Sequence, residues 1–210
     1  MLKINLRKER NIILMALVIG FIITCTYVTY ATTFEMKSLQ EDLASRIIRF
    51  HCIANSDSKE DQTLKLKVRD EILSSMRDEL SNAKDINETR KIILANIDKI
   101  QKIAESVIKR EGKDYKVEVK LEKNVSFPIK NYGDITVPAG KYEALRVIIG
   151  EGAGKNWWCV MFPPLCFVDE SYAVVDTKTN QKLKKVLTDD EYKMITQNRK
   201  VNIKFRLLEK

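Results

Sequence analysis

Histidine and cysteine are scarce in this 210-residue chain, which contains one histidine, His51, and four cysteines. No three or four His, Cys, Asp or Glu residues stand at metal-ligand spacing, which argues against a zinc site. Catalysis by a hydrolase requires a nucleophile, a base and an orienting group together. His51 with Cys159 or Asp57 leaves one alternative of this class, a secreted hydrolase acting on peptides or cell wall. We expect instead a protein that is not an enzyme and needs no cofactor.

Tryptophan, proline and glycine are also rare, yet they gather in residues 150–169. This segment holds both tryptophans, two of the four prolines, three of the seven glycines and two cysteines. A solvent-exposed loop requires none of these residue types. Gly150 and Gly154 enclose three residues where a phosphate-binding loop has four, and Asn156 follows Lys155 where that loop has Ser or Thr. The glycine run is therefore either a flexible connection between two strands or a recognition loop.

Positive charge lies at the two ends of the chain rather than in its middle. The net charge is +8, and residues 1–31 and 178–210 account for all of the excess. A nucleic-acid-binding protein normally carries this charge on its folded body. The distribution argues against nucleic acid and favours an anionic membrane surface or an acidic partner.

A basic segment followed by an apolar run opens the chain. Four basic residues between Lys3 and Arg10 precede an uncharged stretch from Asn11 to Thr33. This is the layout of a secretory signal, and its length approaches that of a membrane span. We expect residues 1–33 to be either a signal peptide, cleaved after Ala31, or a retained membrane anchor. The positive-inside rule places residues 34–210 outside the cytoplasm.

Helical and strand periods alternate along the exported body. Apolar residues at helical spacing from Leu64 to Leu80 and from Ile93 to Val107 predict two amphipathic helices. Alternating apolar and charged residues over Tyr115–Glu122 are typical of a half-buried antiparallel strand. Further strands are expected at Arg46–Ala54, Tyr142–Ile149, Trp157–Phe162 and Val201–Leu207, and short helices at Leu39–Leu43 and from Thr188. The patterns predict one α+β domain with a mainly antiparallel sheet covered by two amphipathic helices.

Two pairs of residues in the 150–169 segment allow alternative interpretations. Cys159 and Cys166 are either a disulfide, which an exported protein can form, or two buried thiols. Trp157 and Trp158 point to opposite faces if the segment is a strand. One tryptophan then enters the core, and the other is exposed or is covered by a helix or a partner. Cys52 is expected to be a buried free thiol.

Several sequence blocks between about residues 46 and 170 form a specific pattern. They are Ile53–Ser58 with Asp61, Gln62 and 64–70, then Phe127-Pro128 with Tyr132-Gly133, Pro138–Gly140 with 142–147, and the run from Gly150 to Asp169. Together these blocks resemble the stage II sporulation protein R family. Cys52 stands where an aliphatic residue is expected, and Lys59 stands where proline is common at a helix start. Neither departure removes a chemically active group.

The resemblance implies an intercompartmental signal of endospore-forming bacteria. Such a protein is exported from the forespore into the intermembrane space, either secreted or anchored by one N-terminal transmembrane helix. There it activates a membrane-embedded aspartic protease of the mother cell, which removes the pro-sequence of the sigma factor sigma E.

We predict that the 150–169 segment contacts this protease. The predicted partner-binding residues are Gly150, Gly152, Gly154, Asn156, Trp157, Trp158, Pro163, Pro164, Phe167 and Asp169. A second candidate surface is Asn55–Arg69, although its polar groups could instead cap a helix. The basic segment after Lys178 is a candidate for contact with anionic membrane.

Overall fold

A computed structural model describes residues 6–167, 175 and 177–197 of the chain. The chain divides into two units, Met1–Leu39 and Gln40–Lys210. The predicted strand at 201–207 and the predicted contact Asp169 lie outside the described residues.

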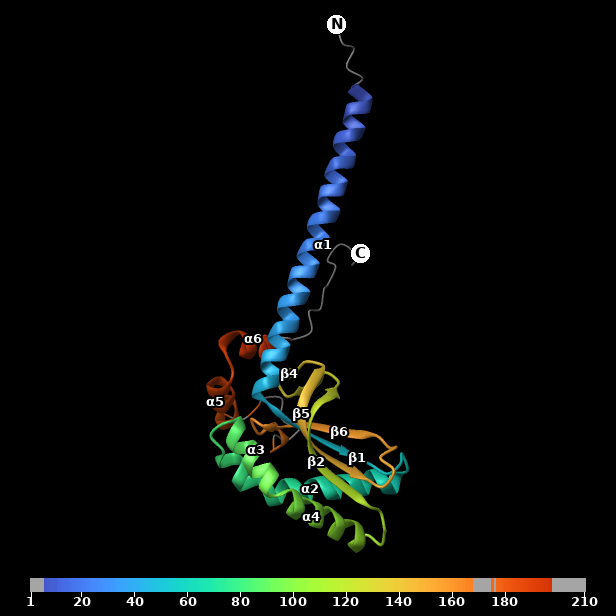
Figure 1. Cartoon of the computed structure of the whole chain (residues 1–210), viewed down its shortest axis with the longest axis vertical. Coiled ribbons are helices and arrows are strands. Elements are labelled where there is room, and N and C mark those ends of the chain that lie inside the picture. The colour runs from blue at the N-terminus through green and yellow to red at the C-terminus, as the bar shows by residue number, and fades with distance from the viewer. Residues whose placement is uncertain (1–5, 168–174, 176, 198–210) are drawn as a thin grey trace, which may run out of the picture. The chain divides into compact units, whose positions relative to one another are not determined.

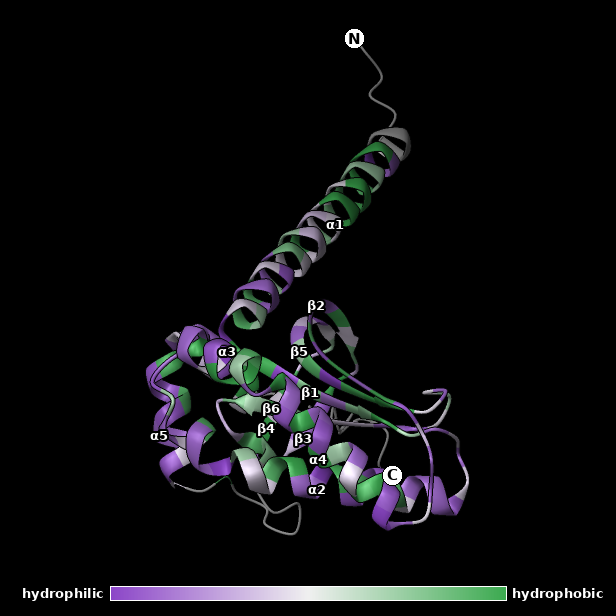
Figure 2. Cartoon of the chain, turned by 60° about the horizontal axis from the view of Figure 1, so that its bottom comes forward, coloured by the Kyte–Doolittle hydropathy of each residue, from purple (hydrophilic) through white to green (hydrophobic). Residues whose placement is uncertain are grey.

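The N-terminal apolar run is helical, within α1 (Leu6–Arg46). Hydrophobic residues are concentrated in its N-terminal half (Figure 2). Within the described residues, this helix alone is long and apolar enough to cross a membrane, a test that an N-terminal signal sequence also meets. Its helical conformation continues through the short helix that we expected separately at Leu39–Leu43, because residues 34–46 contain no glycine or proline.

A four-stranded mixed sheet forms the centre of the second unit (Figure 1). The order of its strands is β2 (Val117–Phe127), β5 (Gly140–Ile149), β1 (Ile48–Ile53) and β6 (Asn156–Phe162). β1 pairs in parallel with β5, whereas the pairs β1–β6 and β2–β5 are antiparallel. The prediction of a mainly antiparallel sheet is confirmed. A separate hairpin of β3 (Lys130–Tyr132) and β4 (Ile135–Val137) follows β2.

Three helices follow β1, where the sequence predicted two. They are α2 (Lys59–Asn82), α3 (Ile86–Ala95) and α4 (Ile97–Arg110). The expected second helix divides at Asn96, whose φ of −109° and ψ of 6° leave the helical region. Asp85 caps α3 by accepting hydrogen bonds from the N–H groups of Asn87 and Glu88. This cap begins the helix earlier than its apolar pattern indicated.

The C-terminal part of the described chain contains η1 (Leu165–Phe167), α5 (Thr177–Val186) and α6 (Asp189–Gln197). The predicted helix start at Thr188 is confirmed by a capping box. The Glu191 carboxylate accepts from Thr188 N at 2.6 Å, and the Thr188 hydroxyl accepts from Glu191 N at 3.3 Å.

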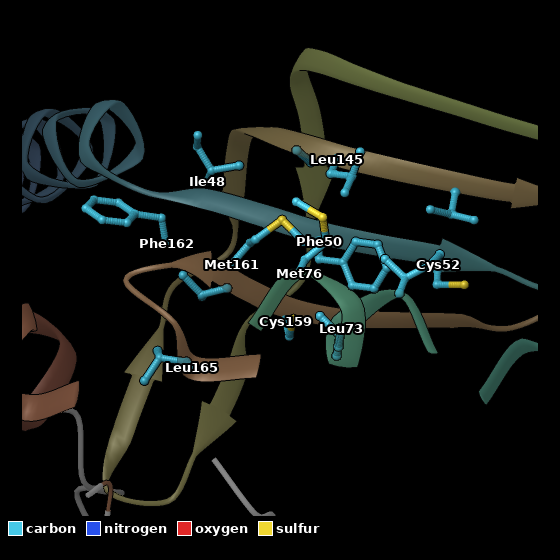
Figure 3. Packing of buried hydrophobic residues seen from close by; sticks show 14 of the residues in the cluster. Ile48, Phe50, Cys52, Leu73, Met76, Leu145, Cys159, Met161, Phe162 and Leu165 are labelled. Atoms are coloured by element: carbon cyan, nitrogen blue, oxygen red, sulfur yellow. The ribbon is translucent and has the colours of Figure 1, made fainter. Parts of the chain in front are cut away.

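A large part of the core lies between the helices and one face of the sheet. Side chains from β1, α2, β5 and β6 gather there, among them Phe50, Met76, Leu145 and Cys159 (Figure 3). Cys52 belongs to this cluster as a buried free thiol, as expected, and burial raises its pKa to about 12. All six residues of β1 are buried, as is typical of a central strand covered on both faces.

Candidate functional site

Two loops meet at one end of the sheet. Because β1 is parallel to β5 and antiparallel to β6, the ends of β1 and β5 lie beside the start of β6. The chain leaves β1 through residues 54–58 and connects β5 to β6 through residues 150–155. We call these segments the paired loops. The two surfaces that the sequence identified separately are therefore neighbours.

Backbone hydrogen bonds join the paired loops. The N–H of Ala153 donates to the carbonyl of Asn55 at 3.2 Å, and the N–H of Gly154 donates to that of Ala54 at 3.0 Å. A Cβ at position 154 would collide with the carbonyl of Ser56. Glycine at 154 thus permits a close approach of two backbones.

Gly150 and Gly152 shape the turn after β5. Their φ angles are +58° and +61°, in the left-handed region that favours glycine. The glycines of this run therefore determine backbone geometry, and the proposal that they contact a partner stays a prediction. The sequence left two interpretations of the run, a flexible connection between two strands or a recognition loop. These contacts give the run a defined backbone shape, which argues against a flexible connection.

Side chains that follow β1 bind the backbone of the 150–155 loop. The Asn55 amide oxygen accepts from Glu151 N at 3.0 Å, and the Asp57 carboxylate accepts from Lys155 N at 2.6 Å. From α2, the buried Lys65 ammonium donates to the carbonyl of Lys155 at 2.9 Å, and burial lowers the pKa of Lys65. The loop is therefore held by side chains on its inner side.

Asp61 fixes the side chains of Asn55 and Ser56 in the first of the paired loops. It is only 4% exposed, and its carboxylate accepts from the Ser56 hydroxyl at 2.6 Å and from the Asn55 amide at 2.8 Å. These hydrogen bonds hold the pKa of Asp61 below its ordinary value. The Ser58 hydroxyl accepts from the N–H of Asp61 and caps α2. The capping expected for this segment is present, and the same segment also binds the second loop.

The outer side of the 150–155 loop carries exposed side chains. Those of Glu151, Ala153, Lys155 and the adjoining Asn156 reach solvent. The loop thus presents side chains outward while its backbone is hydrogen-bonded inward. Such an arrangement suits recognition, because little conformational freedom is lost on binding.

The two tryptophans lie on opposite faces of β6, as predicted, and both are half-buried. Trp157 lies on the helix side, with its ring centroid 6.1 Å from that of Phe50. The Arg69 guanidinium from α2 lies 4.5 Å from the Trp157 ring centroid, within cation–π range. Trp157 is therefore partly covered within the domain, by Phe50 and Arg69. Its contact with a partner stays a prediction.

Trp158 stacks on His51 across the β1–β6 pair. The two ring centroids are 3.8 Å apart and the planes are 19° from parallel. The His51 Nε2 lies 2.8 Å from the Asn156 amide oxygen, the geometry of an N–H donating to that oxygen. Burial, and less strongly the positive charges of Arg146 and Arg49, lower the pKa of His51 to about 4. The imidazole is neutral near pH 7.

A disulfide joins Cys159 of β6 to Cys166 of η1, with Cα atoms 5.3 Å apart, as one of the two alternatives predicted. Pro163 and Pro164, which the bridge encloses, are buried. They therefore do not form the exposed rigid surface expected of partner-binding residues. For Phe167, the structure gives a backbone position within η1.

The hydrolase alternative finds little support in these contacts. Cys159 is disulfide-bonded, and the Asp57 carboxylate is occupied by a backbone N–H of the neighbouring loop. Among the residues that the structure describes, no group of three or more His, Cys, Asp or Glu is placed to hold a metal ion. The paired loops instead form a surface whose backbone is fixed by hydrogen bonds.

The sequence identified most residues of this site but not the bonds that connect them. Asn55, Asp57 and Asp61 were noticed as a capping pattern. The partners of Asn55 and Asp57 lie more than 90 residues later in the chain and have no local signal. Lys65 lay within the second candidate surface, but its burial was not expected. Arg49 and Arg146 were missed as site residues, because a charged residue inside an amphipathic pattern is usually exposed.

Comparison with known proteins gives two matches. The family model described as Stage II sporulation protein R (spore_II_R) matches residues 44–172. The protein named Stage II sporulation protein R from Bacillus subtilis (strain 168) is 40% identical over 129 residues. That alignment covers 61% of this chain and 57% of the relative, so the chain matches little more than half of the relative's length. No solved structure matches the chain.

Proposed function

The chain belongs to the stage II sporulation protein R family, and from this premise we propose that it is an exported signal of endospore formation. It acts from the intermembrane space after export from the forespore. Its target is a membrane-embedded aspartic protease of the mother cell, which then removes the pro-sequence of sigma E. The apolar helix α1 directs export or anchors the protein.

The observation that supports the proposal most directly is the arrangement of the 150–155 loop. Its backbone is hydrogen-bonded to the rest of the domain, and several of its side chains are exposed to solvent. Every polar contact described for the 150–155 loop with residues 54–65 uses a backbone atom of that loop, so its exposed side chains stay available to a partner. The loops also lie within residues 44–172, the part that matches the family. A binding surface for the extracytoplasmic part of the protease is the role that this arrangement suits.

The experiment replaces side chains that the fold does not use. Glu151 and Lys155 are exposed, and the hydrogen bonds described for them use backbone atoms alone. Glu151→Ala with Lys155→Ala therefore leaves the loop intact. We expect this double variant to be exported at the normal level and to reduce pro-sigma-E processing at least severalfold in sporulating cells, measured by immunoblot.

The matched control removes one acid and one base elsewhere on the domain. Asp98→Ala with Lys102→Ala does so on α4, far along the chain from the paired loops. It should leave processing unchanged. Normal processing in the loop variant would exclude the paired loops as the contact. Equal losses in both variants would point to a general defect and contradict the proposal in the same way.

A further inference from the structure

Three basic side chains gather on the sheet face opposite the helices. Arg49 and His51 are two residues apart on β1 and share one face, and Arg146 of β5 is the direct register partner of His51. Neighbouring strands are about 5 Å apart, so these side chains are close. Consistent with that, both arginines lower the pKa of His51.

Each of the three has a buried nitrogen with no hydrogen-bond partner. These atoms are Arg49 Nη1, His51 Nδ1 and Arg146 Nε. Leaving a buried polar group unsatisfied is costly, and a cluster of such groups needs an explanation such as a ligand or an ordered water. Two of the atoms are permanent donors, and His51 Nδ1 becomes one when the ring takes a proton. The missing partner of the two arginine nitrogens is therefore an acceptor.

The charge of the cluster favours one class of acceptor. Arg49 contacts neutral groups, the Tyr132 hydroxyl at 3.0 Å and the rings of Phe127 and Tyr142, and none of its described contacts is a carboxylate. Arg146 donates through Nη1 to Glu122 at 2.6 Å, which neutralises one of the two positive charges. Because His51 is neutral near pH 7 before a ligand binds, the net charge of the empty cluster is +1. This charge matches a carboxylate, whereas a phosphate group brings a charge nearer −2.

Arg146 is the most exposed of the three residues. Its side chain is 22% exposed, while Arg49 and His51 are buried. Asn156, which binds His51, begins β6 directly after the 150–155 loop and is itself exposed. A chain segment lying over the paired loops and Asn156 would thus come near His51, to which Asn156 is hydrogen-bonded.

We propose that Arg146, His51 and Arg49 form a binding site for a carboxylate, supplied by an aspartate or glutamate side chain of the partner protein. Arg146 Nε donates to one carboxylate oxygen, and the buried Arg49 adds positive charge. The bound carboxylate favours the protonated form of His51, which takes a proton from solvent and then donates from Nδ1 to the second oxygen. The partner's identity rests on the function proposed above. The carboxylate site itself can be tested without the partner.

The test uses the full chain in detergent micelles and two blocked amino acids, N-acetyl-glutamate amide and N-acetyl-glutamine amide. Nuclear magnetic resonance follows the Nε–H signal of Arg146, assigned by its loss in Arg146→Gln, and the ring signals of His51. We expect the glutamate compound to shift both signals saturably and to raise the pKa of His51. The charges facing that ring are Arg49, Arg146 and Glu122. The glutamine compound should have no such effect.

Two variants give the comparison. Arg146→Gln removes a charge-assisted hydrogen bond and should weaken binding of the glutamate compound about tenfold, followed on His51. Lys120→Gln removes a positive charge from β2, where Lys120 pairs with Glu118 and Glu122, and should leave binding within about twofold. Equal responses to the two compounds, an unaffected Arg146→Gln, or no shift at all would overturn the carboxylate site.

A cell assay separates this inference from the proposed function. If the carboxylate binds and Arg146→Gln also reduces sigma-factor processing, both stand. If no carboxylate binds but the paired-loop variant abolishes processing, the site is wrong and the proposed function survives. If the carboxylate binds but neither variant affects processing, the paired loops are excluded as the contact with the protease, and the assignment of the partner fails with them.

Discussion

Replacing Gly154 by alanine tests the close contact between the paired loops. The added Cβ would lie 3.0 Å from the Cβ of Ala54 and would collide with the carbonyl of Ser56, a backbone atom. A backbone held by hydrogen bonds on both sides yields less than a flexible side chain does. Overpacking of this kind costs about 1–3 kcal/mol, which for a domain of this size lowers the melting temperature by about 2–12 °C. Separation of the two loops should also reduce processing of the sigma factor.

Gly112→Ala is the matched control. Gly112 ends α4 with a φ of +71°, and a Cβ there would meet nothing within 4 Å. Its cost is therefore conformational strain alone, about 1 kcal/mol, with no effect on the loops. Thermal unfolding followed by tryptophan fluorescence gives the stability, and immunoblotting gives the processing. A Gly154→Ala protein that melts and signals as the wild type does would refute the close packing of the loops.

Two further predictions concern the bridge and the buried histidine. Changing Cys159 and Cys166 together to serine should lower the free energy of unfolding by about 2–3 kcal/mol, measured by urea denaturation under oxidising conditions, whereas reductant should abolish the difference between the variant and the wild type. Burial lowers the pKa of His51 in the folded protein to about 4, so the unfolded chain takes up a proton first as the pH falls. The free energy of unfolding should therefore be highest above about pH 6.5. It should decline between about pH 6.5 and 4, by up to about 3 kcal/mol. In His51→Gln this decline should be absent, and an unchanged profile there would assign the titration to another group.

Local patterns predicted the helices and strands of this fold well, because apolar residues repeat at helical spacing in a helix and alternate in a strand. The alternation over Tyr115–Glu122 became part of β2, and the four-residue spacing from Leu64 to Leu80 became the buried face of α2. The division at Asn96 was missed because the apolar spacing continues across it. A hydrophobic period records which side faces the core but not whether the backbone is continuous.

Strand partners could not be predicted in the same way. β1 is buried at all six positions, so its sequence shows no alternation that would indicate a register or a direction. Its parallel pairing with β5 joins residues about 95 positions apart along the chain. That pairing decides the site, because it brings Asn55 to Glu151 and His51 to Arg146. The residues of the site were visible in the sequence, but their proximity was not.

The Asn156–His51 hydrogen bond connects the paired loops with the proposed carboxylate site. Asn156 lies at the junction of the 150–155 loop and β6, and its amide fixes one nitrogen of the ring whose other nitrogen faces the carboxylate site. A partner that displaces this amide would free His51 to turn, and a partner that protonates His51 would strengthen donation to the amide oxygen. Contacts at the loop and at the sheet face should therefore not be independent. In a double-mutant cycle between Lys155→Ala and Arg146→Gln, additive losses of partner affinity would mean that this hydrogen bond transmits nothing, whereas a coupling beyond about 0.5 kcal/mol would mean that it does.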